Sequence, residues 1–227
     1  MNVLIVYAAQ DPSSFTASLK NVALKELSAK GHGVVVSDLY GLGFSAVAQK
    51  WEFVTTSGKH FNYMLEQKHA ANLDMAFSPD IMAEVQKIKQ ADLILFVTPI
   101  WWFSVPAILK GWFDRVLAMG VTWDGGRIYE TGLLRGKQSM VIAAAGGPAD
   151  YYRPEGRHRA SVNQILHPIN HGTLAFCGLD VHEPFVALNV LGASQEELVQ
   201  ALSELQFRMQ HIQDSPSYLI KYEDTPA

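Results

Sequence analysis

The stretch NVLIVYA, residues 2–8, is apolar at successive positions rather than at every second one. A strand with one wet face alternates apolar and polar residues, whereas a continuous run is typical of a strand buried on both faces of a parallel sheet. A helical pattern follows at 11–33, with Ser13 or Ser14 expected as its N-cap. The first unit of the fold is therefore predicted to be a buried strand followed by a helix.

The same alternation of apolar runs and helical patterns continues along the chain. Further strands are expected at 34–40, 91–99, 139–147 and 181–189, and further helices at 78–90, 105–120 and 193–210. The last helix opens with a capping box of Ser194 and Glu197. Strands that alternate with helices predict an α/β fold, a doubly wound, five-stranded parallel sheet with helices on both faces. Five strands fit the flavodoxin-like order 2-1-3-4-5, in which ligands bind beyond the carboxyl ends of the central strands.

Length and composition suit a single domain over residues 1–227, since 48% of the residues are hydrophobic and 18% are charged. Residues 44–77 have weak periodicity and are predicted to form an excursion off the sheet, while a surface tail is expected from about residue 213. Excursions of this length in a compact domain are usually functional or form an interface. We therefore expect residues 44–77 to matter for function or assembly.

Charge and cysteine content exclude several classes of protein. The formal net charge is −4 and no block of lysine and arginine occurs, which argues against a nucleic-acid or anionic-membrane partner. No apolar run reaches the ~18 residues of a membrane span, and the N-terminus lacks the charged region of a signal peptide. Cys177 is the one cysteine, so no internal disulfide can form and a cytoplasmic location is expected.

The loop after the first predicted strand carries hydroxyl groups at the start of a helix, at Ser13, Ser14, Thr16 and Ser18. A helix N-terminus offers free N–H groups and a partial positive charge, which suit a phosphate or pyrophosphate. Ordinary capping would explain the serines equally well. The loop lacks both the Gly-rich dinucleotide fingerprint and the P-loop motif, so a Rossmann NAD site and an NTPase are disfavoured.

Aromatic side chains follow the third predicted strand. Pro99 should end that strand because it cannot donate to the ladder, and the next helix should begin near Pro106. Between them lie Trp101, Trp102 and Phe103. These three residues belong to no predicted helix or strand, so the pattern gives them no place in the core. Large aromatic residues are usually buried for packing alone. The alternative is that these aromatic side chains pack against a planar ring of a ligand bound at the edge of the sheet.

The loop after the fourth predicted strand combines glycines with possible proton donors. Gly146 and Gly147 let the backbone approach a ligand closely. Tyr152 and His158 can stabilise charge that develops on a neighbouring group and exchange protons. Solvent exposure is the ordinary explanation for a tyrosine and a histidine in a loop. Together, however, the loops after the three strands predict a flavin site. The first loop would bind the phosphates, the aromatic residues would flank the flavin ring, and the third loop would stabilise the reduced flavin.

Two other kinds of chemistry are not supported. His167 and His171 could clamp a metal if they were on a helix, but Pro168 argues against a regular helix and no carboxylate or cysteine completes the set. No metal site is therefore expected. Cys177 lies in an apolar stretch and is interpreted as an inert buried thiol. Serine hydrolase chemistry is disfavoured because no G-x-S-x-G motif occurs.

The residues just described resemble a known family from about residue 2 to about residue 212. The chain is similar to the flavodoxin-like NAD(P)H:quinone oxidoreductases, and within them to the short type that uses dihydronicotinamide riboside. The segments that carry the resemblance are VLIVYA, SLKNVALKELS, VVVSDLY, SPDI, WFSVPAILKGWFDRVL, TGLL, HGTL and FCGL. The resemblance implies a homodimeric flavoenzyme. It would reduce quinones by two electrons, with hydride from a reduced nicotinamide donor and ping-pong kinetics through one site at the dimer interface.

The resemblance also implies roles for individual residues. Tyr152 and His158 match the catalytic pair of the family, Asn62 matches a residue that reaches the FAD of the partner subunit, and Trp123 lines the pocket of the other subunit. The implied cofactor-binding positions are Phe15, Thr16, Ser18, Asn62, Pro99, Ile100, Trp101, Trp102, Phe103, Ala144, Ala145, Gly146, Gly147 and Tyr152. The implied substrate-binding positions are Trp102, Phe103, Trp123, Gly147, His158 and Phe176.

Several positions depart from the family pattern. Thr16 stands where the family has asparagine, Ala144 and Ala145 replace two threonines, and Leu198 replaces an arginine at the adenine end. FAD is still expected in preference to FMN. Ala175 replaces a histidine of the family's metal site, in agreement with the expectation of no metal.

The donor and the acceptor remain open at this point. His158 follows the NADPH-using branch of the family, so NADH, NADPH and dihydronicotinamide riboside are all candidates. The acceptor could be a quinone, an azo dye or a nitroaromatic. The alternative function is that of a flavin-binding regulatory subunit of a potassium-efflux system with little turnover. Those proteins resemble this chain too, but they are shorter and lack the 44–77 excursion.

Overall fold

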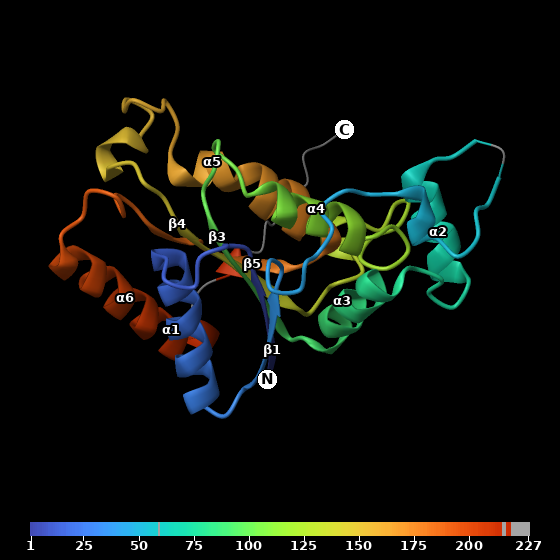
Figure 1. The fold of residues 1–227 in the computed structure, drawn as a ribbon, viewed down its shortest axis with the longest axis horizontal. Helices are drawn as coiled ribbons and strands as arrows, with labels where there is room; N and C mark the ends of the chain where they lie inside the picture. Colours follow the sequence, from blue (N-terminus) through green and yellow to red (C-terminus); the bar gives the residue numbers. More distant parts are fainter. Residues whose placement is uncertain (59, 215–216, 219–227) are drawn as a thin grey trace.

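The computed structural model describes residues 1–58, 60–214 and 217–218. One sheet runs through the molecule in the order β2-β1-β3-β4-β5-β7, and β6 pairs with β4 (Figure 1). All pairings are parallel except that of β7 with β5. The strands are β1 Asn2–Tyr7, β2 Gly33–Asp38, β3 Leu93–Pro99, β4 Gln138–Ala144, β5 Asp180–His182, β6 Phe185–Ala187 and β7 Ser217–Tyr218. The flavodoxin-like fold and the predicted order of the five main strands are confirmed.

The predicted strand at 181–189 is divided into β5 and β6, and both parts pair with β4. Glu183 and Pro184 lie between the two parts. Because Pro184 has no N–H to donate, it cannot continue the ladder. A further difference lies in the predicted tail, where Ser217 and Tyr218 form β7 at the edge of the sheet. Residues 215–216 and 219–227 of that tail lie outside the described residues.

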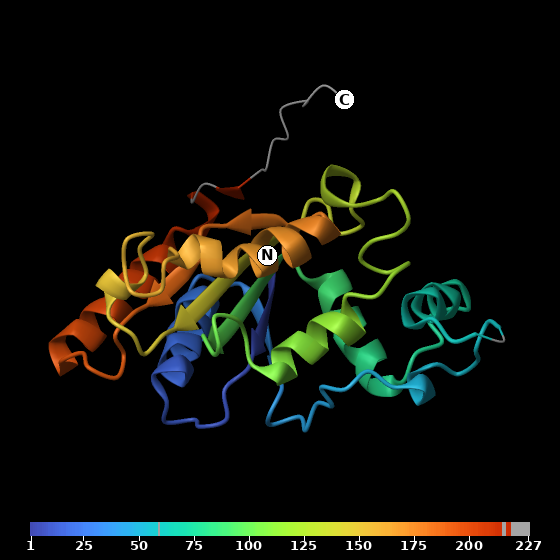
Figure 2. The same cartoon turned by 90° about the horizontal axis from the view of Figure 1, so that it is seen from above.

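Helices cover both faces of the sheet, as Figures 1 and 2 show. Helices α1 and α6 pack with alternate strand residues in one buried cluster, and α3, α4 and α5 pack in the other. In β3, for example, Leu95 faces the first cluster and Phe96 faces the second, both fully buried. The helices are α1 Phe15–Ala29, α2 Tyr63–Asn72, α3 Pro79–Gln90, α4 Ala107–Val116, α5 Val162–Ile169 and α6 Gln195–Gln210. The continuous apolar runs of the sequence are therefore explained by burial on both faces.

The residues between β2 and α3 leave the sheet and carry helix α2 to one end of the molecule (Figures 1 and 2). The fully buried guanidinium of Arg115, at the end of α4, attaches this excursion. Its Nε lies 2.7 Å from Oε1 of Glu52, and its Nη1 donates to the carbonyl of Ser45 at 2.8 Å. Its Nη2 forms an ion pair of 2.7 Å with Asp80. Tyr63 of α2 donates to the other Glu52 oxygen, so one ion network fixes α2 and the excursion to α4.

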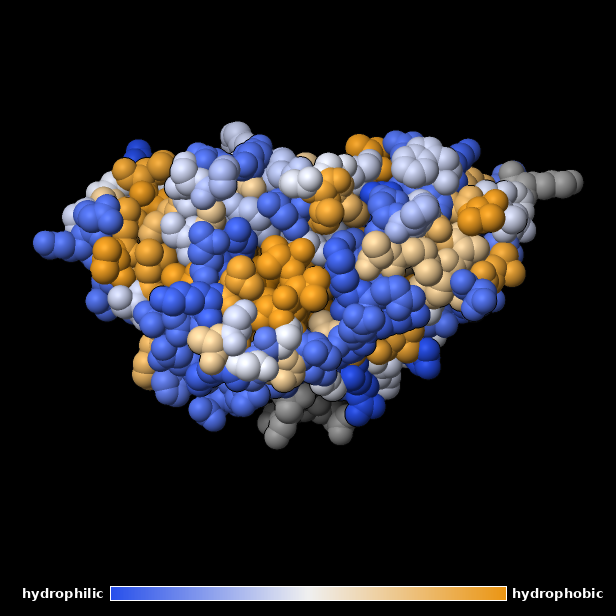
Figure 3. All heavy atoms as spheres, turned by 60° about the horizontal axis from the view of Figure 1, so that its bottom comes forward, coloured by the Kyte–Doolittle hydropathy of each residue, from blue (hydrophilic) through white to orange (hydrophobic). Residues whose placement is uncertain are grey.

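Large apolar side chains of the excursion reach the surface. In Figure 3 apolar patches lie among polar atoms at the right-hand end, where the excursion is found. The exposed members are Val47, Trp51, Val54, Met64, Leu65 and Leu73. Apolar surface of this kind, gathered on one segment, is typical of an interaction surface. Among the described residues, no helix is long and apolar enough to cross a membrane.

Candidate functional site

A strained tight turn follows β3 at the carboxyl edge of the sheet. The N–H of Trp101 donates to the carbonyl of Ser104 and the N–H of Ser104 to the carbonyl of Trp101, both at 2.9 Å. The two central residues have positive φ, +50° at Trp102 and +57° at Phe103. This is the pattern of a type I′ turn, which normally takes glycine or asparagine. A left-handed non-glycine residue costs about 1–2 kcal/mol, and such strain persists mainly at functional sites.

The turn exposes the side chains that a core would have buried. Trp102 is 96% exposed, and Trp101 and Phe103 are each about half exposed. Trp112, only ten residues later on α4, is fully buried and donates from Nε1 to Glu84 at 2.9 Å. Packing in the core therefore accounts for Trp112 and not for Trp102. The backbone of Ile100 pairs with Ala144 (N–H to carbonyl, 2.9 Å) and so joins the aromatic turn to the end of β4.

The glycine loop after β4 lies against the predicted catalytic pair. A Cβ added at Gly147 would lie 3.2 Å from the Tyr152 side chain and 3.5 Å from Nε2 of His158. A Cβ at Gly146 would come within 2.8 Å of the side chain of Leu191. A side chain at Gly146 would collide with Leu191, and one at Gly147 would press on the Tyr152 ring. The two glycines thus let Leu191, Tyr152 and His158 pack closely against the backbone of this loop.

His158 is surrounded by aromatic rings from two loops. Its ring centroid lies 4.8 Å from that of Tyr152, 4.9 Å from that of Phe103 and 5.3 Å from that of Tyr151. Burial raises the pKa of Tyr152, and a hydrogen bond with the Gly147 backbone opposes the rise only in part. The phenol therefore stays protonated and can donate a hydrogen bond. Phe103, Gly147, Tyr152 and His158, predicted from two separate loops, are brought together.

The first loop is placed as predicted, but its serines already have partners. Ser14 caps α1, because its Oγ accepts from the N–H of Ala17 at 3.2 Å. Ser13 donates to Asp11 from both its N–H and its hydroxyl, and these bonds lower the pKa of Asp11. Ordinary capping therefore explains Ser14, and the contact with Asp11 explains Ser13. Phe15, Thr16 and Ser18 belong to the first turn of α1, where Thr16 is buried and Phe15 and Ser18 are half-buried.

Three other predicted residues lie apart from this cluster. The rings of Trp123 and Phe176 meet at 5.4 Å, and Trp123 is fixed by a hydrogen bond from Nε1 to the carbonyl of Leu117 at 3.1 Å. Both line a cavity of about 330 Å³, whose other walls come from α2 and α4. Asn62 is the N-cap of α2, where its Oδ1 accepts from Leu65 at 3.2 Å. No ring contact between described residues joins Trp123 or Phe176 to Phe103, Tyr152 or His158.

The prediction that no regular helix spans the histidine pair fails for His167, which lies on α5, but agrees with the irregular turn that carries His171. Pro168 lies inside α5, which continues as a π-helical turn at Asn170–Leu174. Pro168 and the residue four positions earlier, Gln164, whose carbonyl loses its N–H partner, are both exposed. His167 and His171 consequently stack at 4.9 Å, and burial together with His167 lowers the pKa of His171. Among the described residues, no group of three or more His, Cys, Asp or Glu side chains could hold a metal ion.

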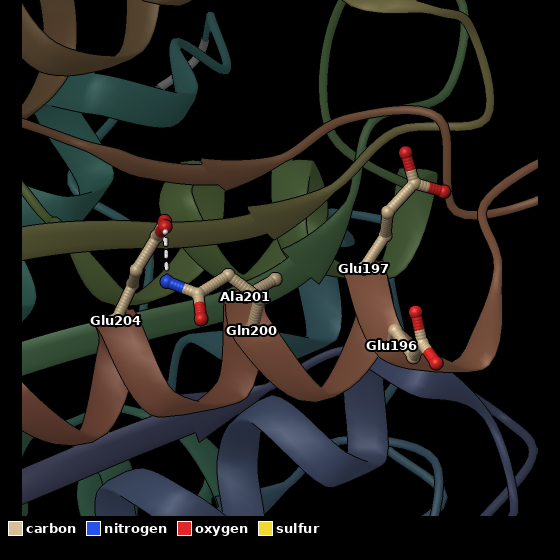
Figure 4. A pocket seen from close by; sticks show the side chains of 5 residues that line it. All are labelled: Glu196, Glu197, Gln200, Ala201 and Glu204. Atoms are coloured by element: carbon tan, nitrogen blue, oxygen red, sulfur yellow. Dashed lines mark hydrogen bonds between the residues drawn. The ribbon is translucent and has the colours of Figure 1, made fainter.

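A second hollow, of about 480 Å³, lies on the outside of α6 (Figure 4). Gln200 donates to Glu204 at 3.0 Å, and Glu197 accepts from the backbone N–H of Ser194 at 2.7 Å in the predicted capping box. Glu196 and Ala201 complete the lining, so the hollow has three carboxylates and no aromatic ring. It would repel a phosphate and could not stack a flat ring. It contains none of the predicted site residues.

Cys177 is buried as expected. Burial raises the pKa of its thiol to about 11, although a hydrogen bond with Thr122 acts in the opposite direction. A thiol with so high a pKa is a poor nucleophile at neutral pH. The predicted assignment of Cys177 as an inert residue is consistent with this environment.

Comparison with known proteins gives concordant results. A family model described as a flavodoxin-like fold matches residues 1–208. The ribosyldihydronicotinamide dehydrogenase (quinone) of Homo sapiens is 42% identical over 212 residues, which are 92% of this chain and 91% of that protein. The NAD(P)H dehydrogenase (quinone) 1 of Rattus norvegicus is 35% identical, over 95% of this chain and 79% of its own.

A solved structure extends the comparison to three dimensions. A protein of Klebsiella pneumoniae, provisionally assigned as a quinone reductase, superposes with a TM-score of 0.88 at 33% sequence identity. The match covers 96% of this chain and 86% of that one. The excursion is therefore largely included in the matched region, since only a few per cent of this chain are left out.

Proposed function

The chain belongs to the flavodoxin-like NAD(P)H:quinone oxidoreductases, and from this premise we propose that it reduces quinones by hydride transfer from a reduced nicotinamide donor. The observation that carries the proposal is the cluster of Phe103, Gly147, Tyr152 and His158 at the carboxyl edge of the sheet. In open α/β sheets this edge is where ligands bind. The substrate class, a quinone and a reduced nicotinamide, comes from the names of the two relatives. The cluster provides the side chains that could stabilise charge during hydride transfer.

The residues at this edge fit a flavin. The exposed aromatic turn offers flat rings, and Gly147 brings a backbone without a side chain next to Tyr152 and His158. When bound, a flavin supplies a carrier that takes a hydride equivalent from the donor and passes it to the acceptor. We propose FAD as the cofactor, with FMN as second choice. Its phosphates would be held by Phe15, Thr16 and Ser18, and its ring by Pro99, Ile100, Trp101, Trp102, Phe103, Ala144, Ala145, Gly146, Gly147 and Tyr152.

Tyr152 and His158 act electrostatically in this proposal. Because burial raises the pKa of Tyr152, its hydroxyl stays protonated and can donate to negative charge that develops next to it. His158 packs against both Tyr152 and Phe103 and can hold or release a proton at the same place. Phe103 packs edge to face against His158 and so helps to fix the position of its ring. These residues orient the reactants and stabilise charge, and proximity supplies much of the remaining rate enhancement.

A homodimer would bring the two groups of predicted residues together. Trp123, Phe176 and Asn62 lie apart from Tyr152 and His158 within one protomer. The excursion next to them exposes six large apolar side chains, which a partner subunit would cover. In the proposed dimer, the site of one protomer is completed by Trp123, Phe176 and Asn62 of the other. Donor and acceptor would then use one pocket in turn, which gives ping-pong kinetics.

The test is turnover by the purified protein, loaded with flavin, with NADPH and the quinone menadione. The proposal predicts sustained oxidation of NADPH and parallel lines in double-reciprocal plots. Flavin binding without turnover would overturn the proposal and favour a regulatory flavin-binding subunit. Mass analysis of the released flavin separates FAD from FMN. The proposal further includes a cytoplasmic location and a single flavin-binding domain over 1–227.

A further inference from the structure

The loop that carries the predicted catalytic pair is strongly cationic. Between Tyr151 and Arg159 it holds three arginines, Arg153, Arg157 and Arg159, and one acidic residue. All three arginines are exposed. The whole chain has a net charge of −4, so this local excess of positive charge opposes the overall balance. We call residues 151–159 the arginine loop.

The arginine loop has a defined conformation. The N–H of His158 donates to the carbonyl of Tyr151 at 3.0 Å, and the N–H of Arg159 to that of Gly156 at 3.1 Å. A Cβ at Gly156 would lie only 2.2 Å from the carbonyl oxygen of Asp150, so the chain folds tightly on itself there. Arg159 has a φ of +55°, a conformation that costs energy in a non-glycine residue. The loop is thus closed by its own hydrogen bonds and holds its arginines in fixed positions along the backbone.

The guanidinium groups have no acidic partners among the described residues. Arg157 donates from Nη1 to the hydroxyl of Tyr151 at 2.9 Å and lies over its ring at 5.3 Å, which orients it without neutralising it. Within residues 1–58, 60–214 and 217–218, no ion pair joins Arg153, Arg157 or Arg159 to a carboxylate. Three positive charges are therefore available to an anionic ligand. Arginine binds phosphate particularly well because its planar guanidinium can donate two parallel hydrogen bonds.

The position of these charges relates them to the reacting centre. His158, between Arg157 and Arg159 in the chain, packs against Phe103 and Tyr152. A donor whose nicotinamide reaches this cluster would bring the rest of its structure past the arginine loop. On the basis of the function proposed above, we infer that Arg153, Arg157 and Arg159 bind the phosphates of a dinucleotide donor and make this enzyme prefer NADPH or NADH to phosphate-free dihydronicotinamide riboside.

The test compares donors in the flavin-loaded protein with all three arginines changed, Arg153→Gln, Arg157→Gln and Arg159→Gln. We expect the KM for NADPH to rise about tenfold or more, because charge-assisted phosphate bonds are lost, and the KM for dihydronicotinamide riboside to stay within about twofold. NADH separates the pyrophosphate from the additional 2′-phosphate, since only NADPH carries the latter. Arg135→Gln is the matched control, because Arg135 is exposed and precedes β4, at the opposite edge of the sheet.

Binding of NADP⁺ to the same proteins, measured by calorimetry at low and high salt, gives a readout without turnover. Wild-type affinity should fall with salt, and the triple variant should bind weakly with little salt dependence. Equal changes for all three donors, or no change for any, would overturn the inference while leaving the proposed function intact. If no donor supports turnover, the proposed function is wrong. The calorimetry still shows in that case whether the three arginines bind the phosphates of NADP⁺. Should the triple variant lose flavin, single variants Arg153→Gln and Arg159→Gln replace it.

Discussion

The rings of Tyr152 and His158 meet edge to face with their centroids 4.8 Å apart, and Gly147 lies against both of them. The two side chains come from one loop, yet a third ring, Phe103, approaches His158 from the turn after β3. Two strand ends therefore build one group of side chains. The chemistry proposed for the protein depends on this arrangement.

The first prediction concerns the glycine beside the pair. Gly147→Ala would place a Cβ 3.2 Å from Tyr152 and 3.5 Å from His158, and would displace the Tyr152 ring from its position in the proposed flavin site. Flavin affinity should fall by about tenfold or more, a loss of at least ~1.4 kcal/mol, measured by fluorescence titration of the apoprotein. Gly125→Ala is the control, since nothing lies within 4 Å of a Cβ there. Equal affinity in the Gly147 variant and the wild type would contradict the assignment.

The second prediction concerns strain in the aromatic turn. Trp102 has a φ of +50° and is 96% exposed, so Trp102→Gly relieves strain and removes almost no buried surface. The free energy of unfolding, measured in urea, should not fall, because strain relief of about 1–2 kcal/mol offsets the greater entropy of glycine in the unfolded chain. Flavin affinity should fall. A loss of stability with unchanged flavin affinity would show that Trp102 supports the fold and not the site.

The third prediction concerns the buried Arg115. Arg115→Met leaves the carboxylate of Glu52 buried without its cation, so the free energy of unfolding should fall by about 3–5 kcal/mol, measured by urea denaturation. Lys110→Met on the same helix is the control. The Lys110–Asp114 pair is exposed, and an exposed pair contributes about 0–1 kcal/mol. Similar losses in the two variants would contradict the role of Arg115 in attaching the excursion.

Much of the fold is predictable from the sequence, because strands that are buried on both faces of a sheet consist of continuous apolar residues. The continuous apolar runs at β1 and β3 predicted a parallel sheet, and the parallel order placed the loops after β1, β3 and β4 at one edge. This order alone predicts that Tyr152, His158 and Phe103 lie near one another. The division of the last strand was missed, although Pro184 was the signal for it.

Other features could not be predicted because they depend on partners far apart in the chain. Arg115 contacts Glu52 and Ser45, 63 and 70 residues away, and no local pattern marks such a contact. The type I′ turn was hidden because tryptophan and phenylalanine occupy positions that usually hold glycine or asparagine. The helical placement of His167 was missed because Pro168 normally ends a helix, and here it lies on an exposed side.

The most direct test of the account is the rate of flavin reduction by NADPH in stopped flow, compared between wild type and the double variant Tyr152→Phe, His158→Ala. The double variant should still bind flavin, so that it can be fully loaded, and should be reduced about a hundredfold more slowly, the size of effect typical for loss of a stabilising donor. An unchanged rate of reduction in a fully loaded variant would contradict the catalytic role of Tyr152 and His158.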